Sequence, residues 1–207
     1  MTTHSLAVTI AYVASVVGVI TVVPQILRTV RHPTMGGVAP LSWAISVVAC
    51  TAWVTYGVRA GVAPQIPGNV LLISGSAAIV LLVPSTLSRS RRALLLLTAV
   101  LAVVSVSTRL APETVGYLAF GIGLFSAWPQ VFATLRGRRE AAGVSLTTFS
   151  LRTAAALGWL SYAVLARDVP VLLSATVMLS TTLLVLVVEA SRRTVPVLDE
   201  IPVLEPA

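Results

Sequence analysis

The chain has few charged residues, and none of them is a lysine. Of its 207 residues 10% are charged and 57% are hydrophobic, and the mean hydropathy is +0.95. Soluble domains carry about 25% charged residues, so this composition excludes an ordinary soluble domain and indicates a membrane protein. The absence of lysine also excludes a retinal protein, because the retinal Schiff base forms on a lysine amine.

Cysteines, metal-ligand clusters and buried carboxylates are equally scarce. Cys50 is the only cysteine, which excludes an intramolecular disulfide and a thiolate metal site. The sequence contains no nucleotide-binding loop and no nucleophile triad, so we expect no enzyme, no cofactor and no metal site. Glu113, Asp168 and Glu189 lie only at the ends of apolar segments. Proton-coupled carriers usually keep a carboxylate inside the membrane, so proton coupling is disfavoured.

Long apolar runs dominate what remains. A membrane-spanning helix needs about 20 mostly apolar residues. Seven segments qualify, with approximate bounds Leu6–Leu27, Ala39–Val58, Pro64–Pro84, Ala93–Thr108, Thr114–Leu135, Ser145–Leu165 and Val169–Ala190, and the fourth is the shortest. No basic residue precedes the first run, so we expect a retained helix rather than a cleaved signal peptide.

The arginines are distributed unequally between the two sides of the predicted membrane. The chain has 14 arginines and a formal net charge of +7. Ten of them follow the odd-numbered spans: Arg28, Arg31, Arg89, Arg91, Arg92, Arg136, Arg138, Arg139, Arg192 and Arg193. The opposite loops hold only Arg59, Arg109 and Arg167. The positive-inside rule therefore predicts a cell-membrane protein with its N-terminus outside and its C-terminus in the cytosol. Charges in such short loops fit contact with lipid headgroups, not with nucleic acid.

The sequence contains an internal duplication. The dipeptide Pro24-Gln25 recurs as Pro129-Gln130 at a shift of 105 residues, and after one inserted residue the shift is 106. At that second shift Trp53, Tyr56 and Pro64 fall on Trp159, Tyr162 and Pro170. Rare residues repeated in order indicate a duplicated unit.

The duplication predicts the domain organisation. Residues 6–84 and 114–190 form two three-helix repeats, and 93–108 form a linker helix between them. A three-helix unit enters and leaves on opposite faces of the membrane, so two copies that point the same way need this additional crossing. Residues 194–207 carry three prolines and three acidic residues, and we expect a disordered cytosolic tail.

The two Pro-Gln pairs predict weak points in two helices. Proline has no backbone N–H, so Pro24 and Pro129 leave the carbonyls of Ile20 and Phe125 without helical partners. The neighbouring Gln25 and Gln130 could donate to such a carbonyl. Hinges near the cytosolic ends of these helices are one interpretation, and static kinks are the other.

Trp53 and Asn69 predict a binding site for a polar solute. Each lies eight residues from the turn at Gly61, so both should lie roughly 10 Å below the outer surface. An amide at that depth needs a partner or a wet cavity, and an aromatic platform beside an amide is typical of a site for a polyol or sugar ring. Tyr56 and Tyr162, one turn further out, are expected in the outer aromatic belt.

The second repeat keeps the tryptophan but not the amide. The same spacing pairs Trp159 with Ala175; the neighbouring Ser174 and Thr176 either offer a hydroxyl or bond their own backbone. Arg152 is the one charge inside a span, seven residues before Trp159. It either snorkels to the headgroups or lines the pathway as a gate or as a partner for an anionic substrate.

The motifs Val23-Pro-Gln-Ile-Leu-Arg and Trp128-Pro-Gln-Val-Phe, each followed by a Gly-Val pair, resemble the PQ-loop family over nearly all of residues 6–190. Within it, the arrangement of three, one and three helices and the Trp-to-Asn spacing resemble a bacterial seven-helix member of the SWEET (MtN3/saliva) sugar transporters. The resemblance implies that Trp53, Asn69 and Trp159 contact the substrate and that Pro24, Pro40 and Pro129 are hinges.

This sequence departs from the family at two positions. Ala175 stands where a second asparagine is expected, and Leu146 stands where a fourth proline is expected. Pro40 also fits an ordinary proline at the start of a helix. The Pro-Gln pair is shared with cystinosin-like amino-acid exporters and with sorting receptors, so fold is better determined than substrate.

The sequence thus predicts an all-α membrane protein, with seven transmembrane helices as two parallel three-helix repeats joined by a linker helix. The expected function is facilitative uniport of a small polar solute, a mono- or disaccharide, by alternating access. The alternatives are a PQ-loop carrier of amino acids or organic anions, which Arg152 favours, and a receptor of the same fold that does not transport. The expected partners are the solute and the lipid bilayer, with a homo-oligomer left open.

Overall fold

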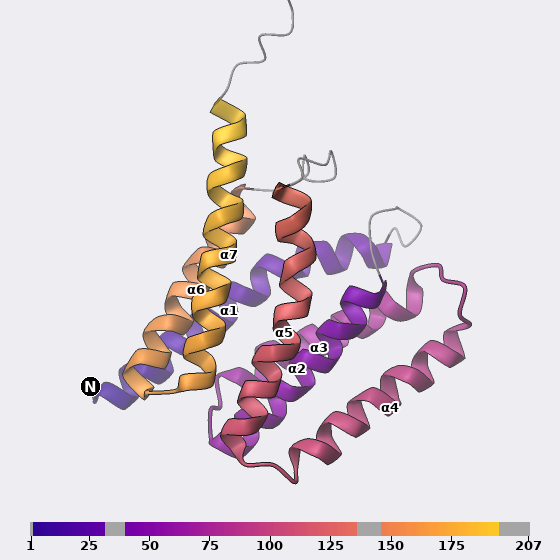
Figure 1. The fold of residues 1–207 in the computed structure, drawn as a ribbon, viewed down its shortest axis with the longest axis horizontal. Helices are drawn as coiled ribbons and strands as arrows, with labels where there is room; N and C mark the ends of the chain where they lie inside the picture. Colours follow the sequence, from indigo (N-terminus) through magenta and orange to yellow (C-terminus); the bar gives the residue numbers. More distant parts are fainter. Residues whose placement is uncertain (1, 32–39, 136–145, 195–207) are drawn as a thin grey trace, which may run out of the picture.

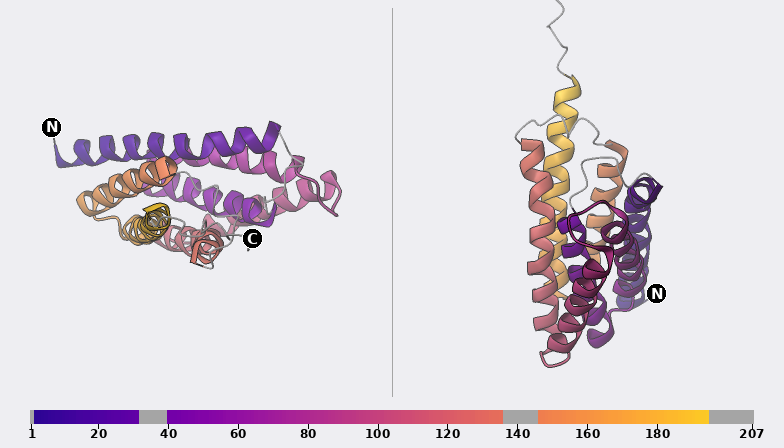
Figure 2. Two further views of the ribbon diagram at one scale, coloured as in Figure 1. Left: turned by 90° about the horizontal axis from the view of Figure 1, so that it is seen from above. Right: turned by 90° about the vertical axis from the view of Figure 1, so that its right-hand side faces the viewer.

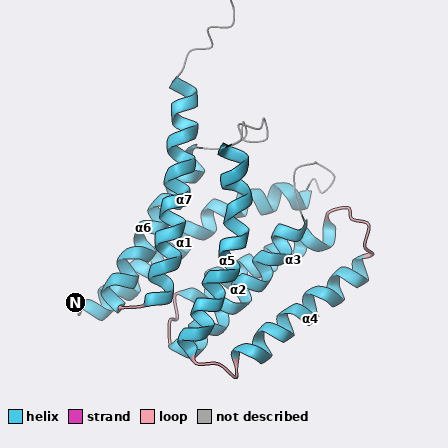
Figure 3. Cartoon of the chain, viewed as in Figure 1, coloured by secondary structure: helices cyan, strands magenta, loops and turns pink. Residues whose placement is uncertain are grey.

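The computed structural model describes residues 2–31, 40–135 and 146–194, and at some of these, including Gln25, Pro40, 126–135 and Glu189, it describes the backbone only. Within these ranges the chain forms seven helices and no strand (Figures 1 and 3). They are α1 (Thr3–Arg31), α2 (Pro40–Ala60), α3 (Gln65–Leu82), α4 (Arg89–Ser107), α5 (Pro112–Leu135), α6 (Leu146–Ala166) and α7 (Val169–Thr194). Apart from Thr194, the predicted tail lies outside the described residues.

The helices have the length and composition of membrane spans. Over the described residues, six of the seven (α1, α2, α3, α4, α6 and α7) are long and apolar enough to cross a bilayer. The side chains of α5 are described only as far as Phe125, and its crossing stays a prediction. The chain is a multi-pass membrane protein.

The predicted boundaries agree with the helices to within a few residues, except around the arginines. Arg89, Arg91 and Arg92, which we expected in a loop, lie in the first turn of α4. The Ser88 hydroxyl accepts a hydrogen bond from the Arg91 backbone N–H at 3.3 Å and caps this turn. The expectation that the fourth helix is the shortest was therefore wrong: α4 has 19 residues and α3 has 18.

Six helices form a closed ring. Going round it, α1 contacts α3, α3 contacts α2, α2 contacts α5, α5 contacts α7, α7 contacts α6, and α6 contacts α1. In the left view of Figure 2, α1 lies along one side of the molecule and α5 and α7 lie along the other. The fourth helix lies outside the ring against α2 and α3. The order of contacts is the same in the two halves, because α3 lies between α1 and α2 as α7 lies between α5 and α6.

Two glycines let α1 approach its neighbours closely. A Cβ on Gly158 of α6 would lie 2.7 Å from the Ala14 Cβ of α1, and a Cβ on Gly68 of α3 would lie 2.6 Å from the Ser15 Oγ. Small residues at such crossings allow membrane helices to pack backbone against backbone. Ala14 and Ser15 are accordingly buried.

The turns that close the two helical hairpins have the same geometry. Gly61 after α2 has φ +73° and Arg167 after α6 has φ 56°. The N–H of Val62 donates to the Gly57 carbonyl at 2.8 Å, and the N–H of Asp168 donates to that of Ala163 at 2.9 Å. Each is the six-to-one bond of a helix that ends in a left-handed residue.

Two arginines fasten α4 to α2 and α3. The Arg92 guanidinium, on α4, donates to the carbonyls of Val80 and Val83 at the end of α3, the latter at 2.6 Å. The Arg59 guanidinium, on α2, donates to the carbonyl of Ser107, the last residue of α4, and to that of Leu110 in the following turn. These cations thus satisfy carbonyls that have no helical partner and lie at the negative ends of the helix dipoles.

Candidate functional site

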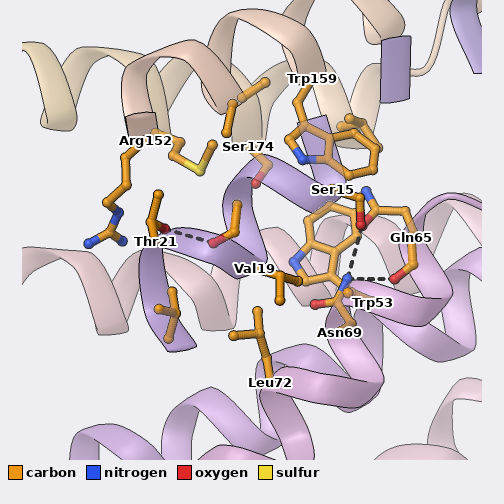
Figure 4. Close-up of a pocket in the computed structure, with 17 residues that line it drawn as sticks. Ser15, Val19, Thr21, Trp53, Gln65, Asn69, Leu72, Arg152, Trp159 and Ser174 are labelled. Atoms are coloured by element: carbon orange, nitrogen blue, oxygen red, sulfur yellow. Dashed lines mark hydrogen bonds between the residues drawn. The ribbon is translucent and has the colours of Figure 1, made fainter. Parts of the chain in front are cut away.

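The ring encloses a cavity of about 210 Å³ between α1, α2, α3, α6 and α7 (Figure 4). Its wall contains all five residues that the sequence singled out for substrate contact: Trp53, Asn69, Arg152, Trp159 and Ala175. They come from four different helices and both halves of the chain. The structure therefore brings together residues that are more than 100 positions apart in the sequence.

Each tryptophan of the cavity packs against a tyrosine of its own helix. The rings of Trp53 and Tyr56 meet edge to face with centroids 5.7 Å apart, and those of Trp159 and Tyr162 do so at 5.9 Å. Such T-shaped contacts are favourable for aromatic rings and hold them in fixed orientations. The same pair therefore supports the cavity wall in both halves.

The assignment of Tyr56 and Tyr162 to the outer aromatic belt was wrong. Belt residues face the headgroups on the lipid side, whereas these side chains are only 4% and 6% exposed. They belong to a packed cluster between the helices. The hydroxyl of Tyr56 can be buried because it donates a hydrogen bond to Asp168 Oδ1 at 2.8 Å.

Asn69 is oriented by a residue that the sequence analysis missed. Its Nδ2 donates to the Gln65 backbone carbonyl at 2.7 Å and to Gln65 Oε1 at 3.1 Å. The Asn69 carbonyl oxygen is left to accept from a ligand. Gln65 is buried and lines the same cavity. The available clue was the spacing of four residues between two amides, which puts them on one helical face.

Three hydroxyls complete the polar lining. Ser15, Thr21 and Ser174 lie in the wall, and the Thr21 Oγ1 donates to the Gly18 carbonyl at 2.7 Å. Ser174 was expected as one source of a hydroxyl near Ala175. Thr176, the other expected source, is exposed, is not among the lining residues, and donates to the Leu172 carbonyl of its own helix at 2.8 Å.

Arg152 lies at the end of the cavity opposite to Asn69. In Figure 4, Arg152 and Thr21 occupy one end, and Trp53, Gln65 and Asn69 occupy the other. The Arg152 Cζ lies 5.6 Å from the centroid of the Phe149 ring, within the range of a cation–π contact. The side chain is partly buried in the cavity wall.

The predicted hinge residues are only partly described. Helix α1 continues through Pro24, whose side chain is exposed, and α5 continues through Pro129 and Gln130. The side chains of Gln25, Pro129 and Gln130 lie outside the described set. Pro40 is the first residue of α2, the position where proline is common in any helix.

The cavity is closed at the end of the ring that carries few arginines. There the N-terminal end of α1 and the turns at Gly61 and Arg167 meet, and a buried cluster fills the space between them. Its members are Ala7, Ala11, Ala52, Trp53, Tyr56, Val62, Val115, Ala119, Tyr162, Ala163 and Val171. The bond from Tyr56 to Asp168 joins the two halves at this end, and Asp168 also accepts from the Val171 N–H at 3.1 Å.

Toward the opposite, arginine-rich end the backbones of the ring helices separate. Figure 1 shows α1, α2 and α3 diverging from α5 and α7 toward this end.

A second cavity, of about 590 Å³, is apolar and offers little chemistry. It lies between α4 and the ring and is lined by side chains of α2, α3, α4 and Ile122 of α5. Its polar lining groups are Ser85 and Arg92, and the Arg92 guanidinium is engaged at the end of α3. Among the described residues, no group of three or more His, Cys, Asp or Glu side chains could hold a metal ion. The first cavity is therefore the candidate site.

Comparison with known proteins identifies the fold. No family profile and no curated protein sequence matches the chain. A solved structure does: the 3.7 Å resolution structure of a eukaryotic SWEET transporter superposes with a TM-score of 0.74 over 92% of this chain and 100% of that one, at 16% sequence identity. The chain has a SWEET-type fold. At this identity, the likeness concerns the fold alone.

Proposed function

We propose that the chain is a facilitative transporter of a small polar solute of the sugar class, working as a uniporter by alternating access. The observation that carries this proposal is that Trp53 and Trp159, at equivalent positions of two helices, line one cavity together with Asn69. Aromatic faces with a few fixed hydrogen-bonding groups suit a solute that is apolar on its ring faces and polar at its edge. The SWEET-type fold supports the same assignment.

The size of the cavity favours a single sugar ring. Pockets for drug-sized ligands measure about 300–1,000 Å³, and this cavity measures about 210 Å³. Of the mono- and disaccharides that the sequence left open, we therefore propose a monosaccharide.

We infer that the two halves are parallel repeats of residues 6–84 and 114–190, joined by the linker helix 93–108. Three features support this: the same order of helix contacts, the same left-handed turns at Gly61 and Arg167, and the same Trp–Tyr ring pairs. Repeats that enclose a central site suit rocking of one half against the other. The described conformation would then be the one open to the arginine-rich side.

The side of opening and the hinges follow from the same proposal. With the N-terminus outside, the arginine-rich end faces the cytosol, and the cavity is open inward. Pro24 with Gln25, Pro40, and Pro129 with Gln130 are the proposed hinge or gate residues, because each proline interrupts or starts the backbone bonding of a helix that bounds the ring.

Sugar uptake into proteoliposomes tests the proposal. Purified protein should equilibrate labelled glucose or another monosaccharide across the bilayer, and the double variant Trp53→Ala/Asn69→Ala should lose at least about tenfold in initial rate, because it lacks the platform and the amide. The matched control is Trp43→Ala, which removes a tryptophan of α2 that does not line the cavity.

Two results would count against the assignment. Equal flux from the wild type and the double variant would remove these residues from the site. Binding of a sugar without flux across a sealed vesicle would point to a receptor instead of a transporter.

A further inference from the structure

Arg152 brings a positive charge to the cavity, and the described lining contains no carboxylate to balance it. Two carboxylates have described side chains, Glu113 in the first turn of α5 and Asp168 at the start of α7. Both lie at the arginine-poor end, and Asp168 is some 20 Å from Arg152 along α6. The ring of Phe149 covers one side of the guanidinium.

An unbalanced cation in a cavity between membrane helices is costly. Charged side chains at such depth are usually paired with an opposite charge or face a water-filled path. A guanidinium has five N–H donors in a planar fork that fits a carboxylate with two parallel hydrogen bonds. Among the residues whose side chains are described, no carboxylate lies in this cavity beside Arg152, so an anion that enters the cavity would supply the missing counter-charge.

The amide and the cation belong to different halves of the ring. Asn69 has Ala175 as its counterpart, and Arg152 has Ser46, whose hydroxyl donates to the Ser42 carbonyl and which does not line the cavity. One end of the cavity therefore presents amides from α3, and the other presents a guanidinium from α6 (Figure 4). Arg152 precedes Trp159 by seven residues, which is about 10 Å along the helix. That length accommodates one sugar ring and one attached acidic group.

We propose that the solute is a monosaccharide that carries a carboxylate, a sugar acid. The carboxylate binds Arg152, the ring lies between Trp53 and Trp159, and ring hydroxyls bond to Asn69 and Gln65. This inference rests on the proposed transport function and names the substrate class of the same site.

The charge balance favours a carboxylate over a phosphate. Arg152 is the one charged residue in the described lining, so a carboxylate neutralises the site. A phosphate monoester carries about −1.5 to −2 charges at neutral pH and would leave a net negative charge in a cavity with no second cation among its described residues.

Glucose and glucuronate form a matched pair of probes, because they differ only at carbon six, which bears a hydroxyl in one and a carboxylate in the other. We expect proteoliposomes with wild-type protein to take up glucuronate at least about tenfold faster than glucose at equal low concentration, as hydrogen bonds to a charged group are worth about 10- to 100-fold. Because uniport of a monoanion moves charge, an imposed potential of 100 mV, positive inside, should raise its equilibrium accumulation roughly 50-fold. Glucose 6-phosphate should be taken up more slowly than glucuronate.

The variant Arg152→Met should lower the ratio of glucuronate to glucose flux at least about tenfold, and Arg152→Lys should keep part of it because the charge remains. The matched control is Arg109→Met, an exposed arginine remote from the cavity, which should leave the ratio unchanged. Glucose flux that equals or exceeds glucuronate flux in the wild type, or an unchanged ratio in Arg152→Met, would overturn the sugar-acid inference while leaving the transport proposal in place. Absence of flux for all three solutes would overturn the transport proposal itself, and the inference with it. Faster uptake of glucose 6-phosphate than of glucuronate would replace the carboxylate by a phosphate.

Discussion

At the scale of single residues, the turns after α2 and α6 share a backbone conformation but differ in the residue that adopts it. Gly61 and Arg167 both adopt positive φ, a conformation that costs a residue with a Cβ about 1–2 kcal/mol and costs glycine almost nothing. The two turns make the same backbone bond, so the chain uses the fitting residue at one of them and a strained residue at the other.

Single substitutions at Arg167 and at Gly61 should therefore change the stability of the protein in opposite directions. We expect Arg167→Gly to raise the free energy of unfolding by about 1 kcal/mol, because the strain disappears, and Gly61→Ala to lower it by about the same amount. Thermal unfolding in detergent, followed by tryptophan fluorescence, measures both shifts. Arg109→Gly is the control for loss of charge, since Arg109 has no positive φ. A lower unfolding temperature for Arg167→Gly would contradict the strain argument.

The sequence could predict that the candidate site residues lie around one cavity, but their polar contacts were not predicted. Trp53, Asn69 and Trp159 could be placed because helix rise and distance from a turn fix depth. Gln65 was missed, and Tyr56 was assigned to the wrong surface. The bond between Gln65 and Asn69 lies within α3, and their spacing of four residues could have indicated it. The contact of Tyr56 with Asp168 joins two different elements and depends on how the helices are rotated and packed, which hydropathy does not give.

At the scale of elements, helix extents follow from the thickness of the bilayer, and their exact ends follow from caps. The apolar cores of all seven predicted segments agree with the described helices. The start of α4 was missed because Ser88 caps a helix that continues outward through three arginines. Helix ends in the headgroup region can carry charge, so the end of an apolar run is not the end of the helix.

The crossing of α1 and α6 depends on the absence of a side chain at Gly158. We expect Gly158→Ala to lower the free energy of unfolding by about 1–3 kcal/mol, because its Cβ would meet that of Ala14 and the helices would have to separate. A matched exchange on α5, Gly121→Ala, meets no atom within 4 Å. It should instead stabilise the protein by up to about 1 kcal/mol through helix propensity.

Unfolding by heat or by denaturant of the two purified variants separates these effects. Equal shifts of the same sign would show that the close approach of α1 and α6 contributes nothing to stability.

At the scale of the whole molecule, the ring is packed at one end and diverges at the other. In a background that carries Cys50→Ala, we expect Thr21→Cys in the cavity to react with a membrane-impermeant maleimide faster from the arginine-rich side than from the other side. Val62→Cys should react slowly from either side, because that residue is 7% exposed within the packed cluster. Right-side-out and inverted vesicles give the two rates.

Ala111→Cys, at the exposed turn between α4 and α5, serves as the reactive control for the arginine-poor side. It should be labelled in intact cells if the N-terminus is outside, as the distribution of arginines predicts. Faster labelling of Thr21→Cys from the same side as Ala111→Cys would contradict the proposed direction of opening.

The attachment of α4 determines which helices can move together. Arg59 and Arg92 hold both ends of α4 against α2 and α3. We therefore expect the linker helix to move together with the first three helices. The covalent path to the second half narrows to residues 108–111 between α4 and α5. In the proposed rocking motion, a body of four helices and a body of three would be joined covalently by this short segment alone. The first body carries the amide of Asn69, and the second carries the guanidinium of Arg152.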